Sequence, residues 1–310
     1  MNMPIAIALI AGVVGQGPPA RRPVVLTTDI GAEVDDQWAL VHLALLPGID
    51  LKGIVTTHSP SLPAPAAEGA ARIAREWLAR LPEGRRPPVL AGSNRPLFSK
   101  EATASNPGVD FLLEQARGRT PADRLTVIVL GAATDVASAL RIDPAWADRV
   151  TIVAMGFNEW DIGGDVWNVK NDPDAWRTLL ESSIPIVVGD SALTRKALAM
   201  TPDRARRLLA DGPEPGPALV RELEAWLARS GKLAESETGS ATTWPIWDEV
   251  TTAILLGLAT AETRPRPRLN ADLSFDHSRP AGEIRWVTAI DADALWADLA
   301  ARIRAGRRED

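Results

Sequence analysis

Four carboxylates stand close together near the start of the chain, at Asp29, Glu33, Asp35 and Asp36. Carboxylates this close repel one another unless some are protonated or a cation lies between them. A hard divalent cation would relieve the repulsion, and calcium accepts about six to eight oxygen ligands. The sequence has no EF-hand loop, because no Asp-x-Asp-x-Asp-Gly run with a closing glutamate occurs. The cluster therefore predicts a calcium site of a different construction.

Helix capping is the alternative explanation for part of this cluster. Asp35 and Asp36 lie where a helical stretch begins, and aspartates at such positions cap the helix and interact favourably with its dipole. Capping accounts for one aspartate. It does not account for Asp29, which follows an apolar run, or for Glu33, so the metal interpretation is favoured.

The composition restricts both the ligands and the partners of the protein. The chain has 310 residues and no cysteine, which excludes disulfides and thiolate metal sites. Its three histidines, His42, His58 and His277, are too scattered to suggest a zinc site. A formal net charge of −6 argues against a nucleic-acid partner, because such proteins usually carry a basic face. Any metal is therefore expected to bind oxygen atoms or these few histidines.

Apolar runs rich in β-branched residues alternate with helical stretches from residue 22 onward. The runs lack apolar–polar alternation, which is typical of strands buried on both faces of a parallel sheet. The predicted strands are 24–28, 51–57, 125–131, 150–155, 184–189 and 283–290, and the predicted helices are 36–46, 66–81, 109–117, 134–140, 173–182, 202–229, 244–258 and 292–303. This pattern predicts an α/β fold with a doubly wound, mostly parallel open sheet and flanking helices. We expect one domain over residues 22–305.

Polar residues directly follow several of these predicted strands. They include Asp29, residues 56–58, Thr134 and Asn158. In an open α/β sheet, the carboxyl ends of the strands form the edge at which ligands bind. One site at this edge is therefore expected.

The N-terminal residues resemble a secretory signal peptide. An apolar run at residues 5–14 is followed by a polar, proline-rich stretch at 15–22. We expect residues 1–20 to be a signal peptide and the protein to be secreted or periplasmic. The run lacks a preceding Lys or Arg, so a disordered tail or an extra strand on a cytoplasmic protein is the alternative. The run is too short to span a membrane.

The acidic segment resembles the N-terminal signature of inosine-uridine type nucleoside hydrolases, which has the form Asp-x-Gly-x-acidic-x-Asp-Asp. Further resemblances follow in the family's order. They are Pro-Val-Leu-Ala-Gly-Ser-Asn-Arg-Pro-Leu at 88–97, Leu-Gly-Ala-Ala-Thr-Asp-Val-Ala at 130–137, Met-Gly-Phe-Asn at 155–158, Asn168 with Asp-Pro-Asp-Ala at 172–175, and Trp-Asp at 247–248. The chain is thus similar to this family over about residues 22–305.

The resemblance implies calcium-dependent hydrolysis of the N-glycosidic bond of ribonucleosides, which releases free base and ribose. It implies that Asp29 binds calcium and acts as general base on a calcium-bound water, with Asp36 as the bidentate ligand. The backbone carbonyl of Thr134 and the distant Asp248 are implied as further metal ligands, although each residue is also placed to cap a helix. Asp35 is implied to hold water or a ribose hydroxyl, with helix capping as its alternative role.

The sugar contacts of the family are only partly matched. Asn158 and Asn168 resemble the asparagines that bind ribose hydroxyls. The family often has a glutamate two residues before the second asparagine, whereas this chain has Val166 there, with Asp165 as the candidate substitute. A plain turn over residues 161–165, which are rich in Gly and Asp, is the alternative.

Two further positions depart from the family's pattern. The asparagine expected shortly after the second predicted strand is missing, and His58 or Ser59 is the candidate sugar contact there. Trp247 stands where many family members have a histidine that assists the departing base. A tryptophan there resembles the purine-preferring branch, in which an indole stacks on the base. Core packing at a helix start is the alternative role for Trp247.

The sequence therefore predicts an N-glycosyl hydrolase that acts on a small-molecule ribonucleoside, with a preference for purines and calcium as cofactor. The altered sugar contacts leave hydrolysis of another glycoside open. The missing histidine leaves open a calcium-dependent protein that binds a sugar or nucleoside without turnover. A homo-oligomer is compatible with the sequence.

Overall fold

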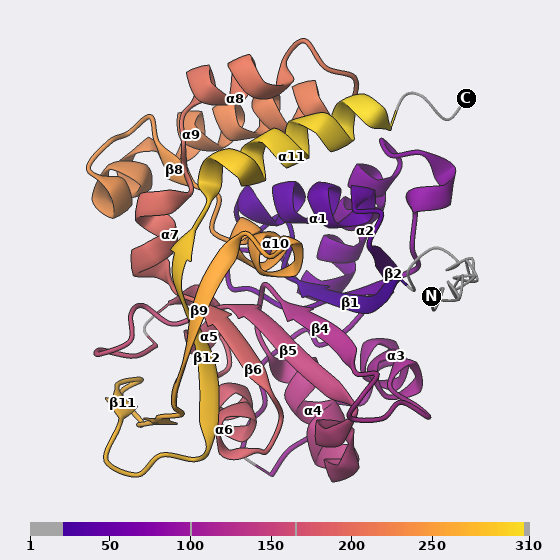
Figure 1. Ribbon diagram of the computed structural model, residues 1–310, viewed down its shortest axis with the longest axis vertical. Coiled ribbons are helices and arrows are strands. Elements are labelled where there is room, and N and C mark those ends of the chain that lie inside the picture. Colours follow the sequence, from indigo (N-terminus) through magenta and orange to yellow (C-terminus); the bar gives the residue numbers. More distant parts are fainter. Residues whose placement is uncertain (1–20, 100, 165, 307–310) are drawn as a thin grey trace, which may run out of the picture.

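The computed structural model describes residues 21–99, 101–164 and 166–306, and an eight-stranded sheet lies at its centre (Figure 1). The strands are β1 (Arg22–Thr28), β2 (Ile49–Thr56), β3 (Val89–Ala91), β4 (Leu125–Val129), β5 (Val150–Met155), β6 (Ile186–Gly189), β9 (Ala259–Pro265) and β12 (Glu283–Ile290). Their order is β3-β2-β1-β4-β5-β6-β12-β9. Neighbours pair in parallel except β9, which pairs antiparallel to β12. The predicted doubly wound, mostly parallel open sheet is confirmed.

The strand order reverses between β1 and β4. From β1 the chain moves outward through β2 to β3, and it then returns to place β4 on the other side of β1. At such a point the connections after the two neighbouring strands diverge, which opens a crevice at the carboxyl ends. Asp29 follows β1 and Leu130 follows β4, so the acidic cluster stands at this crevice.

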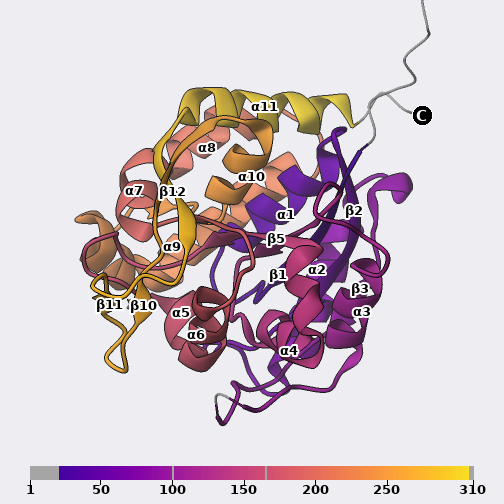
Figure 2. The same ribbon diagram turned by 60° about the horizontal axis from the view of Figure 1, so that its bottom comes forward.

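Helices cover both faces of the sheet, as Figures 1 and 2 show from two directions. One face carries α1 (Asp35–Leu45), α2 (Ala66–Leu78), α8 (Pro202–Leu209), α9 (Gly216–Thr238), α10 (Glu249–Leu256) and α11 (Ala292–Ala305). The other carries α3 (Pro107–Gln115), α4 (Thr134–Ile142) and α6 (Pro173–Glu181). The short helices α5 (Trp167–Lys170) and α7 (Ser191–Ala197) follow β5 and β6. The central strands are therefore buried from both sides, which explains their largely apolar sequences.

The remaining elements are short. Two small antiparallel pairs join β7 (Ala199–Met200) to β8 (Trp244–Pro245) and β10 (Arg268–Leu269) to β11 (Phe275–Asp276). Two 3-10 turns lie at Glu83–Arg85 and Pro144–Asp148.

Two of the predicted helices are wrong in extent. The stretch 202–229 divides into α8 and α9, because Pro213 and Pro215 lie between them and proline cannot donate a helical hydrogen bond. The stretch 244–258 begins with β8, and α10 starts only at Glu249. Trp247 and Asp248 therefore belong to the connection that precedes α10, not to the helix itself.

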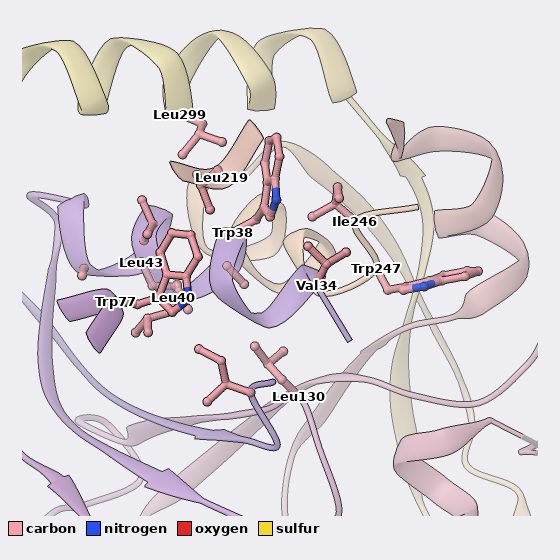
Figure 3. Close-up of a cluster of buried hydrophobic side chains, with 14 of the residues drawn as sticks. Val34, Trp38, Leu40, Leu43, Trp77, Leu130, Leu219, Ile246, Trp247 and Leu299 are labelled. Carbon is pink, nitrogen blue, oxygen red and sulfur yellow. The ribbon is translucent and has the colours of Figure 1, made fainter. Parts of the chain in front are cut away.

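The apolar core on the α1 face explains how α1 is held over the crevice. Figure 3 shows side chains of α1, including Trp38 and Leu43, with Leu219 and Leu299 above them and Leu130 below. Trp38 packs edge-on against Trp296 of α11, with ring centroids 6.0 Å apart. The ring of Trp247 extends away from the other labelled side chains in Figure 3. It marks the edge of this core.

None of the helices within the described part of the chain combines the length and apolar character needed to cross a membrane. The expected signal peptide at residues 1–20 lies outside the described residues.

Candidate active site

A cavity opens at the carboxyl edge of the sheet, at the crevice between β1 and β4. Its volume is about 190 Å³, whereas a single water needs only about 10–15 Å³, so it admits a small organic molecule. Its walls include the connections after β1, β2, β4, β5 and β6, together with α9 and the segment before α10. The lining residues discussed below are Asp29, Glu33, Asp35, Asp36, Ser59, Leu130, Asn158, Val166, Trp167, Asn168, Lys170, Arg195, Glu237, Trp244, Trp247 and Asp248.

The turn between β1 and α1 brings the acidic residues into this cavity. Gly31 has a φ of +98°, a conformation that a residue with a Cβ rarely adopts. The turn closes through a hydrogen bond from the Ala32 amide to the carbonyl of Asp29, at 3.0 Å. The hydroxyl of Thr28 donates to the Asp36 carboxylate and accepts from the Ile30 amide. These contacts fix the start of α1 and the orientation of Asp36.

Three carboxylates gather around one point. One oxygen from each of Asp35, Asp36 and Asp248 lies within 4.8 Å of the others, and all three residues are buried. Asp248 comes from the segment before α10, more than two hundred residues along the chain. The structure therefore brings the carboxylates of Asp36 and the distant Asp248 close together, which is the arrangement that a shared metal site requires.

A buried ion pair holds α10 against α1. His42 of α1 contacts Glu249, the residue after Asp248, with 2.9 Å between Nδ1 and Oε2. Its Nε2 lies 3.1 Å from Asp298 of α11. Although burial lowers it, the Glu249 and Asp298 carboxylates raise the pKa of His42 to about 9. The protonated His42 thus fixes Asp248 relative to Asp36, and it has no contact with the cavity lining itself.

The electrostatics of the cluster are unfavourable without a cation. Burial, followed by the charges of Asp36 and Asp35, raises the pKa of Asp29 well above its usual range. Burial and neighbouring carboxylates likewise raise the pKa values of Asp35 and Asp248. Burial raises the pKa of Asp36 to about 7, against the opposing effect of the Thr28 hydrogen bond.

This donor set fits a hard divalent cation. It consists of buried carboxylate oxygens that converge on one point, and oxygen is the ligand type that calcium and magnesium prefer. A cation at this point would neutralise the repulsion that raises these pKa values. The predicted oxygen-ligated metal site therefore agrees with the structure in its chemistry.

Asp29 lines the same cavity beside this group of three. Its carboxylate accepts a hydrogen bond from Ser59, which follows β2. Gly131 lies close against it: a Cβ at that position would lie 2.9 Å from the Asp29 amide nitrogen and 3.0 Å from Oδ1. Sequence reasoning gave Gly131 no role, although it forms part of the 130–137 motif.

Thr134, the predicted backbone ligand, is not among the residues that line the cavity. Its backbone carbonyl accepts the Ser138 hydroxyl at 2.7 Å inside α4, and its hydroxyl donates to Asp172 at 2.6 Å. The carbonyl is therefore directed along α4, because Thr134 is the first residue of that helix. Leu130, four residues earlier, is the member of this connection that lines the cavity.

His58 is also placed differently from the expectation. It is buried, and its Nε2 lies 2.9 Å from the Thr134 hydroxyl. Because that hydroxyl donates to Asp172, the His58 ring must donate to it. Burial lowers the pKa of His58 despite the charge of Asp172. His58 therefore joins a structural hydrogen-bond chain behind the wall, and its neighbour Ser59 lines the cavity instead.

The side of the cavity formed after β5 carries the two predicted asparagines. Asn158 and Asn168 both line it, and the Asn168 side chain donates to the carbonyl of Met155 at 3.1 Å. Val166 also lines this side, so an apolar surface stands where the family often has a glutamate. Asp165 lies outside the described residues.

Aromatic side chains also line the cavity. Trp247 lines the cavity and meets Trp244 edge-on, with ring centroids 6.1 Å apart and planes at 89°. Arg195 of α7 lies near the indole of Trp247 and pairs with Glu237 of α9. The sequence reasoning did not single out Arg195 or Glu237. The position of Arg195 after β6, at the carboxyl edge of the sheet, could have identified it as a candidate. No feature of the α9 sequence identifies Glu237 in the same way.

The chain matches the family described as inosine-uridine preferring nucleoside hydrolase over residues 24–297. It is 25% identical over 228 residues to the pyrimidine-specific ribonucleoside hydrolase RihA of Salmonella paratyphi C, an alignment that covers 65% of this chain and 70% of the relative.

Solved structures share the fold. A plant nucleoside hydrolase, PpNRh1, has a TM-score of 0.73 at 18% identity and covers 92% of this chain and 100% of its own. A purine-preferring ribonucleoside hydrolase from Gardnerella vaginalis has a TM-score of 0.70 at 18% identity, with 93% and 100% covered.

Proposed function

Since this chain belongs to the inosine-uridine preferring nucleoside hydrolase family and is therefore an N-glycosyl hydrolase of ribonucleosides, we propose that it depends on calcium and prefers purine substrates. One observation carries this proposal. The converging carboxylates of Asp35, Asp36 and Asp248 share a single cavity with the indole of Trp247. A group suited to activating water and a surface suited to stacking a base thus line the same cavity.

Asp35, Asp36 and Asp248 would hold the calcium ion, with Asp29 at its margin. The carbonyl of Leu130 is the candidate backbone ligand in place of Thr134, because Leu130 lines the cavity. When bound, calcium would hold and polarise the attacking water.

Asp29 is the proposed general base. It lines the cavity and accepts a hydrogen bond from Ser59, which orients one of its oxygens. With a cation beside it the Asp29 carboxylate would stay ionised, and from the cavity wall it could take the proton of a water held there. The water oxygen would then bond to the anomeric carbon as the bond to the base breaks through an oxocarbenium-like state.

Asn158 and Asn168 are the proposed contacts of the sugar hydroxyls, with Ser59 in the place of the missing asparagine. Trp247 is proposed to stack on the base. Its planar apolar ring offers more contact to a two-ring purine than to a pyrimidine. RihA is described as pyrimidine-specific and the Gardnerella vaginalis enzyme as purine-preferring, so both preferences occur among similar proteins.

Hydrolysis of another glycoside is the second candidate. Val166 lines the sugar side of the cavity, where it cannot hydrogen-bond a ribose hydroxyl. A sugar that lacks one hydroxyl would suit this surface better. Binding without turnover is set aside, because the chain belongs to a family of enzymes.

The test is base release from inosine, adenosine and uridine by the calcium-loaded protein, with chelated protein alongside. Asp29→Asn is expected to abolish turnover while calcium still binds, and Asp110→Asn, an exposed carboxylate of α3, serves as control. Activity that survives Asp29→Asn, or that is indifferent to chelation, would contradict the proposed mechanism. Faster turnover of deoxyribonucleosides would support the second candidate.

We also propose export of the protein, on the basis of the apolar run at residues 5–14. Sequencing of the mature N-terminus after expression in a bacterial host tests this. A mature protein that retains residue 5 would argue for the cytoplasmic alternative.

A further inference from the structure

Arg195 lies in the cavity next to Trp247, and the function proposed above gives it no role. It belongs to α7 and lines the cavity together with Trp247 and Glu237. Lys170 is the other cation among the described lining residues, and it lies over the ring of Trp167 at 4.3 Å, in the helix that carries Asn168. Lys170 thus lies beside Trp167, whereas Arg195 lies beside Trp247, the proposed stacking surface for the leaving base.

Two contacts place the Arg195 guanidinium. Its Nη2 donates to Glu237 Oε2 at 2.9 Å, and its Cζ lies 5.4 Å from the ring centroid of Trp247. The guanidinium thus lies over the indole of Trp247, and both side chains line the cavity.

The hydrogen bonding of Arg195 is incomplete. A guanidinium carries its N–H donors in a rigid planar fork, and Nε of Arg195 is buried without an acceptor among the described residues. An unpaired buried donor is costly. The side chain as a whole remains 34% exposed and lines the cavity.

We propose that Arg195 recognises acceptor atoms on the leaving base, which makes 6-oxopurine ribonucleosides the preferred substrates. The O6 and N7 atoms of hypoxanthine or guanine are adjacent acceptors that match the arginine fork. Adenine carries an amino donor in place of O6 and would leave one N–H without a partner. This inference rests on the proposed function, because it takes Trp247 as the surface on which the base stacks.

The same contact acts on the reaction itself. When the bond between C1′ and N9 breaks, its electron pair passes to the purine, and the negative charge spreads onto N7 and O6. The water oxygen bonds to C1′, its proton goes to Asp29, and the purine anion takes a proton from solvent. Arg195 keeps its own proton and stabilises the developing charge electrostatically.

Kinetics on three substrates test the inference. They are inosine, adenosine and p-nitrophenyl riboside, whose leaving group needs no stabilisation by the protein. Wild type is expected to prefer inosine to adenosine. Arg195→Gln is expected to lower kcat/KM for inosine by about 10- to 100-fold, to lower it less for adenosine, which keeps N7, and to change p-nitrophenyl riboside by less than about threefold. Lys196→Gln, at the exposed neighbouring position on α7, is the matched control.

Binding of free hypoxanthine and adenine, measured by calorimetry, gives a second readout. Arg195→Gln should weaken hypoxanthine binding selectively. If that variant fails to fold by circular dichroism, Glu237→Gln leaves the guanidinium in place but unpinned, and a smaller loss, greatest for inosine, is expected.

Three results would overturn the inference and leave the proposed function standing. These are equal use of inosine and adenosine by wild type, equal losses on inosine and p-nitrophenyl riboside in Arg195→Gln, and unchanged hypoxanthine binding. Absence of hydrolysis of all three substrates by the calcium-loaded wild type would overturn the proposed function and this inference together.

Discussion

Removal of calcium is predicted to make the folded protein progressively less stable between about pH 5 and pH 7, and Asp36 should report this effect. Burial raises the pKa of Asp36 from 3.8 to about 7 in the metal-free protein. Between these two values the native state keeps a proton that the unfolded chain has released. The native state therefore binds more protons than the unfolded state, and the free energy of unfolding falls as the pH rises.

The size of the effect follows from the same pKa values. Each pH unit of difference between the native and unfolded pKa corresponds to about 1.36 kcal/mol. The native and unfolded pKa values of Asp36 differ by about three units. Ionisation of Asp36 therefore lowers the free energy of unfolding by about 4 kcal/mol above pH 7, and by less than about 2 kcal/mol at pH 5. Asp36→Asn removes the charge but keeps an oxygen that accepts from Thr28. The free energy of unfolding of Asp36→Asn, relative to that of wild type, should therefore increase by about 2–3 kcal/mol between pH 5 and pH 7.5.

Urea unfolding followed by tryptophan fluorescence, with calcium chelated, measures this difference at several pH values. His42, whose raised pKa gives stability that is lost as the pH rises from 6.5 through about 9, contributes equally to both proteins and cancels. With calcium present at about 100 times its Kd, wild type should gain about 2.7 kcal/mol that the variant lacks. The exposed Asp110→Asn is the control. A wild-type-to-variant difference that does not change with pH would refute the reasoning.

Three further substitutions have defined outcomes. Gly131→Ala is expected to lower kcat/KM on inosine by about 10- to 100-fold, because the new Cβ would displace the Asp29 carboxylate; unchanged steady-state kinetics would contradict the close approach. His42→Leu is expected to lower the free energy of unfolding by about 3–5 kcal/mol, because Glu249 would keep a buried charge without its partner; a loss below about 1 kcal/mol in chemical denaturation would argue against a charged pair. Trp247→Leu is expected to reduce kcat/KM for purine nucleosides about three- to tenfold more than for uridine, and an equal loss on both would argue against stacking.

Strands that are buried on both faces are predictable, because their residues form apolar runs that can be recognised in the sequence. The apolar run at β5 gave the bounds Val150–Met155 correctly, since all of its residues except Thr151 are buried. The short β3 and the exposed edge strand β9 have no comparable pattern, and β9 consists mainly of polar residues. Their pairing depends on neighbours far along the chain, which periodicity cannot reveal.

The site was predictable where a side chain follows a strand or belongs to a compact motif. Asp36 and Asp248 converge as expected, because the motif order implied one shared site. Thr134 and His58 show the limit of this reasoning. Both are polar and both follow strands, yet they bond to each other behind the cavity wall. Residue type and position allow either role, and only the packing of α4 against the sheet decides between them.

The acidic cluster is held in place by the surrounding fold and not by its own interactions. Asp36 stands at the start of α1 and Asp248 directly before α10, where the helix dipoles favour negative charge by about 0.3–1 kcal/mol each. This is well below the roughly 4 kcal/mol by which the buried charge of Asp36 opposes folding near neutral pH. The remainder must come from the packing of α1 and α10 beneath α11, which Figures 1 and 2 show side by side, and from the buried pair of His42 and Glu249. A variant that loosens this packing should therefore release the carboxylates from one another and weaken calcium binding before it unfolds the sheet.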